Sequence, residues 1–82
     1  MVLQILGSGC PKCQQLAQNA QAAIDDVGSE ASVEKVTDMD KIMDMGVAMT
    51  PALAIDGEVK SVGKVLTSEK IAELIRAEQA PL

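Results

Sequence analysis

The sequence predicts an α/β domain of β-α-β-α-β-β-α order, in which a four-stranded mixed sheet carries helices on both faces. Three observations lead to this fold class. An uninterrupted apolar run at residues 2–6 is typical of a strand buried on both faces. Apolar residues then recur at helical spacing through residues 11–27. Asp56-Gly57, between two short apolar segments, is a strong two-residue hairpin signal.

The first helix has sequence signals at both of its ends. Gly7-Ser8-Gly9 predicts a flexible turn after the first strand. Cys10-Pro11 then opens the helix, because the N–H that proline lacks is not needed in the first helical turn. Gly28 is a natural stop. The apolar stripe between these ends comprises Leu16, Ala17, Ala20, Ala23, Ile24 and Val27.

The middle of the chain predicts a second strand and a short helix. Residues 31–36 form the strand, which a right-handed crossover places parallel to the first. Thr37 is suited to cap a helix over residues 39–45, and Gly46 ends that helix.

The last third of the chain predicts a hairpin followed by a helix. Residues 51–55 form a third strand, and residues 58–62 pair with it in antiparallel fashion. Thr67 caps the final helix, and we expect residues 80–82 to be frayed. The apolar face of this helix comprises Ile71, Leu74 and Ile75.

A chain of 82 residues has room for one domain, which we assign to residues 1–82. Such a domain buries only about two-thirds of the surface of its unfolded chain. Because Phe, Tyr and Trp do not occur, the core must be built from Leu, Ile, Val, Met and Ala. Met39 and Met43 share a predicted helix face, and we expect them to fill part of that core.

Composition argues against several classes of function. The net charge of −5 opposes binding to nucleic acid or to anionic lipid, and the lack of aromatic residues rules out base-stacking platforms. The lack of His removes the commonest metal ligand and general base. The apolar start has no basic region before it, and no run approaches the roughly 20 residues of a membrane span. We expect a cytoplasmic monomer.

The most informative motif is Cys10-Pro11-Lys12-Cys13, at the junction of a strand and a helix. A helix N-terminus offers free N–H groups and a partial positive charge, both of which stabilise a thiolate. Lys12 adds a cation, and Pro11 stiffens the turn. A spacing of three residues places Cys13 one turn later on the same face, within disulfide reach of Cys10. This pattern predicts thiol exchange, with Cys10 attacking and Cys13 resolving.

Other interpretations of two closely spaced cysteines remain open at this point. The pair could be half of a zinc site, a soft-metal or metalloid site, or simply two inert cysteines. Zinc needs four ligands, whereas this chain offers two thiols and no His, so we expect no metal site. The order of elements also differs from the βαββαβ order of copper chaperones.

The G-S-G-C-P-K-C segment at residues 7–13, followed by M-T-P-A-L-A-I-D-G-E-V-K-S-V-G-K at residues 49–64, resembles a known family. This family is that of the small thioredoxin-like and glutaredoxin-like redox-active disulfide proteins of archaea and bacteria. The resemblance covers nearly the whole chain and implies a minimal thioredoxin fold. It implies that Cys10 is the nucleophile, that Cys13 resolves the mixed disulfide, and that a cis Pro51 faces them.

The resemblance also implies a substrate surface, although the sequence departs from thioredoxins at two positions. Thr50 would offer backbone groups to a substrate segment, and Gly63 would border the same surface. Thioredoxins carry a Trp where this chain has Gly9. They bury an Asp six residues before the first cysteine, where this chain has Gln4. Because Gln4 cannot titrate, proton transfer to the resolving thiol would need water or another group.

Two further clusters invite a metal. The methionines at 39, 43, 45 and 49 could join the two cysteines in binding copper, but core packing explains Met39 and Met43 better. Met49 is expected beside the site, where it would help to form an apolar docking surface. The acidic residues of the short helix have no calcium loop around them and predict a solvated helix face: Asp38, Asp40 and Asp44.

These observations lead to the hypothesis of a thiol–disulfide oxidoreductase that needs no cofactor of its own. Its substrate would be a disulfide in a protein or a small molecule, and its electrons would come from a flavin disulfide reductase or a small thiol. The alternatives are a soft-metal or metalloid binding module that uses the same thiolates, and an interaction module switched by its disulfide.

Overall fold

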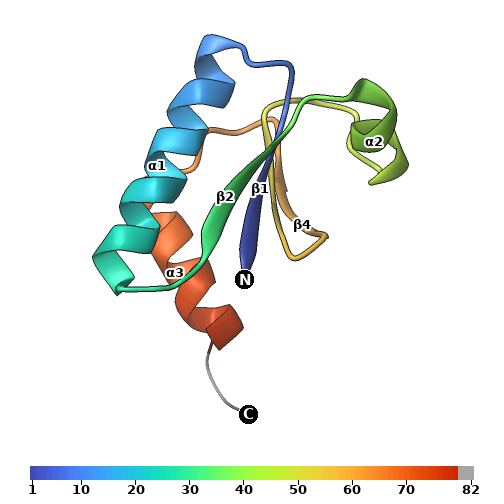
Figure 1. Cartoon of the computed structure of the whole chain (residues 1–82). Helices are drawn as coiled ribbons and strands as arrows, with labels where there is room; N and C mark the ends of the chain where they lie inside the picture. Colours follow the sequence, from blue (N-terminus) through green and yellow to red (C-terminus); the bar gives the residue numbers. More distant parts are fainter. Residues whose placement is uncertain (80–82) are drawn as a thin grey trace.

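A computed structural model describes residues 1–79 and has the predicted order of elements (Figure 1). The prediction of a frayed end at residues 80–82 lies outside the described residues. The bounds of the elements are β1 Val2–Leu6, α1 Pro11–Val27, β2 Ser32–Val36, α2 Met39–Asp44, β3 Ala52–Ile55, β4 Glu58–Val62 and α3 Ser68–Gln79.

The sheet has four strands in the order β2-β1-β3-β4. β1 pairs with β2 in parallel and with β3 in antiparallel fashion, and β3 pairs antiparallel with β4. The hairpin turn lies where the sequence predicts it, because Asp56 and Gly57 both adopt the positive φ that such a turn requires. Asp56 also ties the turn to β1, since its Oδ1 accepts a hydrogen bond of 2.8 Å from the Val2 N–H.

The strand residues point alternately to two apolar clusters, which confirms helices on both faces of the sheet. On one face, Leu3, Ile5 and Leu53 pack against α1 and α3. On the other face, Leu6 and Ala52 pack against Ile42 of α2. Figure 1 shows α1 and α3 together on one side of the strands and α2 on the other.

The predicted stop of α1 and the predicted cap at the start of α3 are confirmed, whereas the start of the short helix differs. Gly28 closes α1 in the left-handed conformation, and Thr67 Oγ1 accepts a hydrogen bond of 3.1 Å from the N–H of Lys70 in α3. The cap of α2 is Asp38 and not Thr37, because the Asp38 carboxylate accepts a hydrogen bond of 2.9 Å from Asp40 N–H. The two candidates are adjacent in the sequence, and either side-chain oxygen suits a cap.

Two strand boundaries and the end of α2 also move by one residue. β2 begins at Ser32, because the Ala31 N–H is held in a turn by the Ser29 hydroxyl at 3.0 Å. β3 begins at Ala52, immediately after Pro51. Met45 caps the end of α2 and is not part of it.

The expectation that Met39 and Met43 fill the core is wrong. Their side chains are 50% and 67% exposed. α2 has only six residues, so one side chain, Ile42, is enough to fill the space beneath it, and its neighbours on the helix turn outward. The acidic residues of this segment are exposed, as predicted.

Among the described residues, no helix has the length and hydropathy needed to cross a membrane.

We expect Ile42→Ala to destabilise the protein by about 2–5 kcal/mol, because it empties a site from which solvent is fully excluded. Met43→Ala, one residue further along α2, is a matched control and should change the free energy of unfolding by less than about 0.5 kcal/mol. Urea unfolding of reduced protein measures both. Equal losses in the two variants would contradict the packing of α2 described above.

Candidate active site

The two cysteines lie where β1 gives way to α1, at the end of the sheet that also carries α2 (Figure 1). The Gly7 N–H extends the β1–β2 ladder by donating to the carbonyl oxygen of Val36 at 3.0 Å. Gly9 then turns the chain with a φ of +88°, a conformation that favours glycine. The Gln14 side chain donates to the Gly9 carbonyl oxygen at 3.0 Å and so ties this turn to the helix.

Cys10 is the N-cap residue of α1, and Cys13 lies in the first turn of the helix. The Cys10 sulfur accepts a hydrogen bond of 3.3 Å from the Cys13 backbone N–H. The two sulfur atoms are 2.6 Å apart as free thiols. Pro11 occupies the first helical position, where no N–H partner is required. The helix therefore holds one sulfur at its positive end and the second sulfur directly against it.

The two thiols have opposite environments. The hydrogen bond from the Cys13 thiol, with further bonds from the backbone N–H groups of Cys13 and Lys12, lowers the pKa of Cys10. Burial is the main factor that raises the pKa of Cys13, whose side chain is only 4% exposed, and its hydrogen bond to Cys10 adds to this effect. Cys10 is therefore the thiol that ionises first, and Cys13 holds its proton.

Gly7 makes room for the second sulfur, a role that the sequence analysis did not assign to it. A methyl group added at Gly7 would overlap Cys13 Sγ and would lie 3.4 Å from Cys13 Cβ. Gly7 does not have a positive φ, so its lack of a side chain serves close approach. The signal in the sequence that could have predicted this role is a glycine directly after a strand and six residues before the second cysteine.

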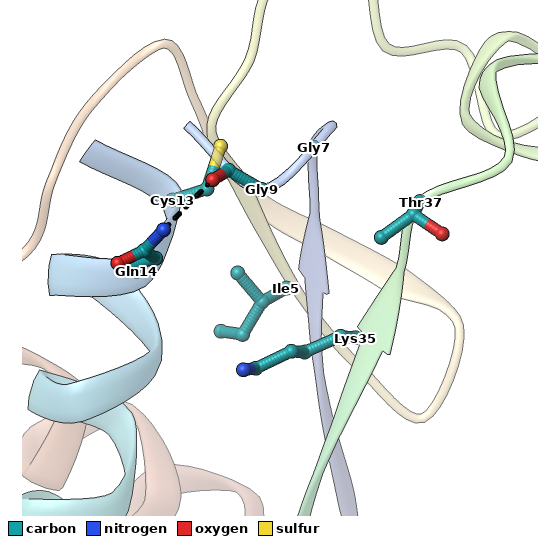
Figure 2. Close-up of a pocket in the computed structure, with 7 residues that line it drawn as sticks. All are labelled: Ile5, Gly7, Gly9, Cys13, Gln14, Lys35 and Thr37. Carbon is teal, nitrogen blue, oxygen red and sulfur yellow. Dashed lines mark hydrogen bonds between the residues drawn. The ribbon is translucent and has the colours of Figure 1, made fainter. Parts of the chain in front are cut away.

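A cavity of about 30 Å³, roughly the room that one water molecule needs, lies beside Cys13. Figure 2 shows Ile5, Lys35 and Thr37 among its lining residues. Of the β1 side chains, Ile5 lines this cavity together with Cys13, whereas Gln4, the position that the resemblance compared with a buried Asp, does not. Gln4 instead accepts a hydrogen bond of 2.8 Å from the N–H of Gly57. The chain therefore offers no carboxylate from β1 to this thiol.

The residues expected to form a substrate surface lie together. The Thr50–Pro51 peptide bond is cis, as the resemblance implied. The Gly63 N–H donates to the Pro51 carbonyl oxygen at 2.8 Å, and the Met49 side chain lies against Gly63. A methyl group at Gly7 would lie 3.6 Å from the Thr50 Cβ, which places this loop beside Cys13. Lys12 is exposed to solvent at the start of α1.

Thiol and carboxylate side chains do not form a metal-binding cluster in the part of the chain that the structure describes. Within residues 1–79, no three or more Cys, Asp or Glu side chains are placed to hold one ion.

Comparison with known proteins agrees with this geometry. The family model of the thioredoxin domain matches residues 1–76. The chain belongs to the thioredoxin family. A thioredoxin of Methanothermobacter thermautotrophicus is 41% identical over 75 residues, which cover 92% of this chain and 97% of that protein. A thioredoxin of Methanocaldococcus jannaschii is 36% identical over 77 residues, which cover 94% and 88%.

Membership of the thioredoxin family at this level of identity makes the chain a thiol–disulfide oxidoreductase. The minimal thioredoxin fold predicted from the sequence is confirmed by the four-stranded mixed sheet and its three helices. Thioredoxins act on disulfides, and a reductase restores their reduced form.

We expect Gly7→Ala to destabilise the reduced protein by about 1–3 kcal/mol, because the new methyl group overlaps the Cys13 sulfur. In a Cys13→Ala background the same substitution should be neutral or slightly stabilising, since alanine restricts the unfolded chain more than glycine does. A double-mutant cycle by urea unfolding measures the coupling. An equal cost in both backgrounds would show that Gly7 does not make room for the sulfur.

Proposed function

We propose that Cys10 and Cys13 are the redox pair of this oxidoreductase, with Cys10 as nucleophile and Cys13 as resolving thiol. The observation that carries this assignment is the asymmetry of the pair. One sulfur caps the helix and has a lowered pKa, while its neighbour at 2.6 Å is buried and has a raised pKa. Nucleophilic attack needs a thiolate, and resolution needs a second thiol within bonding reach.

The exchange takes place in two steps. The Cys10 thiolate attacks one sulfur of a substrate disulfide, which forms a mixed disulfide and releases the other substrate sulfur as a thiolate. Cys13 then loses its proton and attacks the Cys10 sulfur, which forms the Cys10–Cys13 disulfide and releases the second substrate thiolate. Two electrons pass to the substrate, whose thiolates take up two protons. In this proposal the proton of Cys13 passes to solvent.

The loop around the cis peptide bond is the surface that we assign to substrate. Thr50 lies beside the thiol pair and presents backbone groups to an extended segment. Pro51 is held by Gly63, and Met49 covers that glycine with an apolar side chain that is 63% exposed. An apolar side chain next to the substrate cysteine would lie against Met49.

Lys12 and Pro11 tune the nucleophile in this proposal. The Lys12 backbone N–H contributes to lowering the pKa of Cys10. Its ammonium adds a mobile charge at the same helix end, which solvent and salt screen. Pro11 fixes the backbone at the first helical position, so that the cap keeps its geometry.

The substrate is a disulfide of a protein or of a small molecule, and a flavin disulfide reductase or a small thiol returns the electrons. No cofactor enters this cycle. We assign residues 1–82 to one domain that acts as a monomer in the cytoplasm, where the redox poise keeps such a pair reduced.

In partial alkylation of the reduced protein, we expect Cys10 to be labelled before Cys13. Because the pKa of Cys10 is lowered, its alkylation rate rises at lower pH than that of an ordinary cysteine. The pKa of Cys13 is raised, so its alkylation rate rises at higher pH than that of an ordinary cysteine. Lys12→Glu should shift the Cys10 profile to higher pH, and more so at low salt. Iodoacetamide labelling across pH, followed by peptide mapping, measures both. Labelling of Cys13 first would reverse the assignment.

Cys10→Ser should abolish disulfide reduction, because no nucleophile remains in reach of the substrate. Cys13→Ser should retain the first step and accumulate a mixed disulfide through Cys10. Turnover with a small aromatic disulfide tests the first variant, and mass spectrometry after incubation with the same compound tests the second.

Ser8→Ala, in the same loop, is the control and should turn over at the wild-type rate. Retained activity in Cys10→Ser, or the lack of any adduct in Cys13→Ser, would refute the proposed roles.

A further inference from the structure

A hollow of about 490 Å³ lies between α1 and β2, next to the loop that carries the thiols. The redox roles proposed above make no use of it. Three glutamines of α1 and one lysine of β2 give its lining a polar character. The lining includes Gly9, Gln14, Gln18, Gln21, Val33 and Lys35.

This hollow adjoins the thiol pair. Gly9, Gln14 and Lys35 line both the hollow and the small cavity beside Cys13. Gly9 is also the residue directly before Cys10. A small molecule joined through its sulfur to Cys10 can therefore extend past Gly9 into the hollow.

Of the residues that line the cavity and the hollow, only Lys35 carries a charge. Lys35 is the partner of Ile5 in the parallel ladder, so the two side chains share the face of the sheet that α1 covers. Figure 2 shows the Lys35 side chain reaching from β2 past Ile5 toward α1. The ion pairs within residues 1–79 involve Lys60 and Lys70, and the Lys35 ammonium pairs with no carboxylate there.

Amide groups of α1 complete the polar lining. The Gln14 amide donates to the Gly9 carbonyl oxygen at 3.0 Å, and the Gln21 amide donates to Asp25 Oδ1 at 3.2 Å. Gln18 lies one turn from each of these glutamines on the same face of the helix. An ammonium and an amide donor in one hollow suit a carboxylate, which accepts hydrogen bonds from both.

The groove beside α2, on the other side of the thiols, offers an anion no such group. Its lining has no charged side chain and includes Met39, Ile42, Met43, Val47 and Thr50. The neighbouring Asp38, Asp40 and Asp44 are exposed, and the chain as a whole has a net charge of −5. These charges repel an anion, so the hollow with Lys35 is the place beside the thiols that favours one.

We propose that the hollow between α1 and β2 binds the carboxylate tail of a small thiol that returns electrons to the Cys10–Cys13 disulfide, with Lys35 as the ion-pair partner of that tail. This proposal rests on the redox roles given above. It narrows the electron donor to a small thiol with an anionic tail.

The reduction takes place in two steps. One donor thiolate attacks the Cys10 sulfur, which breaks the Cys10–Cys13 bond and releases Cys13 as a thiolate that takes up a proton. A second donor thiolate attacks the donor sulfur of this mixed disulfide, which releases the Cys10 thiolate and the donor disulfide. Two electrons pass from the two donor thiols to the cysteine pair. Because the tail of the first donor lies in the hollow, Lys35 stabilises the mixed disulfide.

The test measures which tail Cys10 prefers in the mixed disulfide. The full chain with Cys13→Ser, which cannot resolve the adduct, is equilibrated with equal concentrations of mercaptopropionate and mercaptopropanol and with their disulfides. The two thiols have the same reach and differ in charge, and mass spectrometry of the intact chain gives the ratio of their adducts. Lys35→Gln and Lys35→Glu are introduced in this background. Lys41→Gln and Lys41→Glu, on the exposed surface of α2, make the same changes of charge outside the hollow.

We expect Lys35→Gln to lower the ratio of carboxylate adduct to alcohol adduct about threefold, which is the size of effect that an ion pair in contact with solvent has. Lys35→Glu should lower this ratio about tenfold, because repulsion of similar size replaces the attraction. Both changes should shrink at high salt. The Lys41 variants should leave the ratio nearly unchanged.

The oxidised chain with both cysteines gives the kinetic counterpart. Lys35→Gln should slow its reduction by mercaptopropionate about threefold more than its reduction by mercaptopropanol. The comparison of one variant with the parent chain removes the difference in intrinsic reactivity between the two thiols.

The proposal is overturned if the adduct ratio is the same with and without the Lys35 substitutions. It is also overturned if the Lys41 variants lower the ratio as much, because the net charge of the chain then sets the preference. Equal slowing of the two thiols in Lys35→Gln would place the effect of Lys35 on the cysteines and not on the tail, which again overturns it. A Cys13→Ser chain that forms neither adduct would refute the redox roles themselves.

Discussion

The hydrogen bond from the Cys13 N–H to the Cys10 sulfur is the interaction on which the site depends. It makes a cysteine the cap of α1, so the same contact that starts the helix also stabilises a thiolate. The next consequence is steric. A sulfur that caps the first turn brings the second sulfur to 2.6 Å, and this second sulfur fits only because Gly7 has no side chain. The activation of Cys10, the burial of Cys13 and the close approach of the two sulfur atoms therefore follow from one local geometry.

That geometry is useful only if the end of α1 is fixed against the sheet. The inner face of α1 carries alanines at 17, 20 and 23, all buried, so the helix lies close to β1. Asn19 of α1 donates to the Leu66 carbonyl oxygen at 2.9 Å and positions the start of α3. A core without aromatic residues gains its stability from many small contacts of this kind. The other face of the sheet is covered by fewer side chains. Ile42 and Val47 are buried against it, and Met39 and Met43 of α2 stay exposed to solvent.

The resulting molecule has a pronounced asymmetry around its thiols. The hollow between α1 and β2 has several polar side chains in its lining, among them Gln14, Gln18 and Lys35, whereas the groove beside α2 is lined mainly by apolar side chains. In a protein with so little surface, exposed methionines cost solubility, and an acidic net charge offsets that cost. β1 places no carboxylate beside Cys13, and Ile5 lines the small cavity there.

Local signals in the sequence by themselves determined the order of the elements, the hairpin at Asp56-Gly57, the ends of α1 and the identity of the cysteine pair. Each of these depends on residues close together in the chain, where spacing and backbone preference decide the outcome. Only the tertiary structure decided which side chains face one another. It lined the cavity beside Cys13 with Ile5 and not Gln4, turned Met39 and Met43 outward, and gave Gly7 its role beside the sulfur. These are contacts between segments, and they are set by the packing of α1 and α2 on opposite faces of the sheet, which no local pattern encodes.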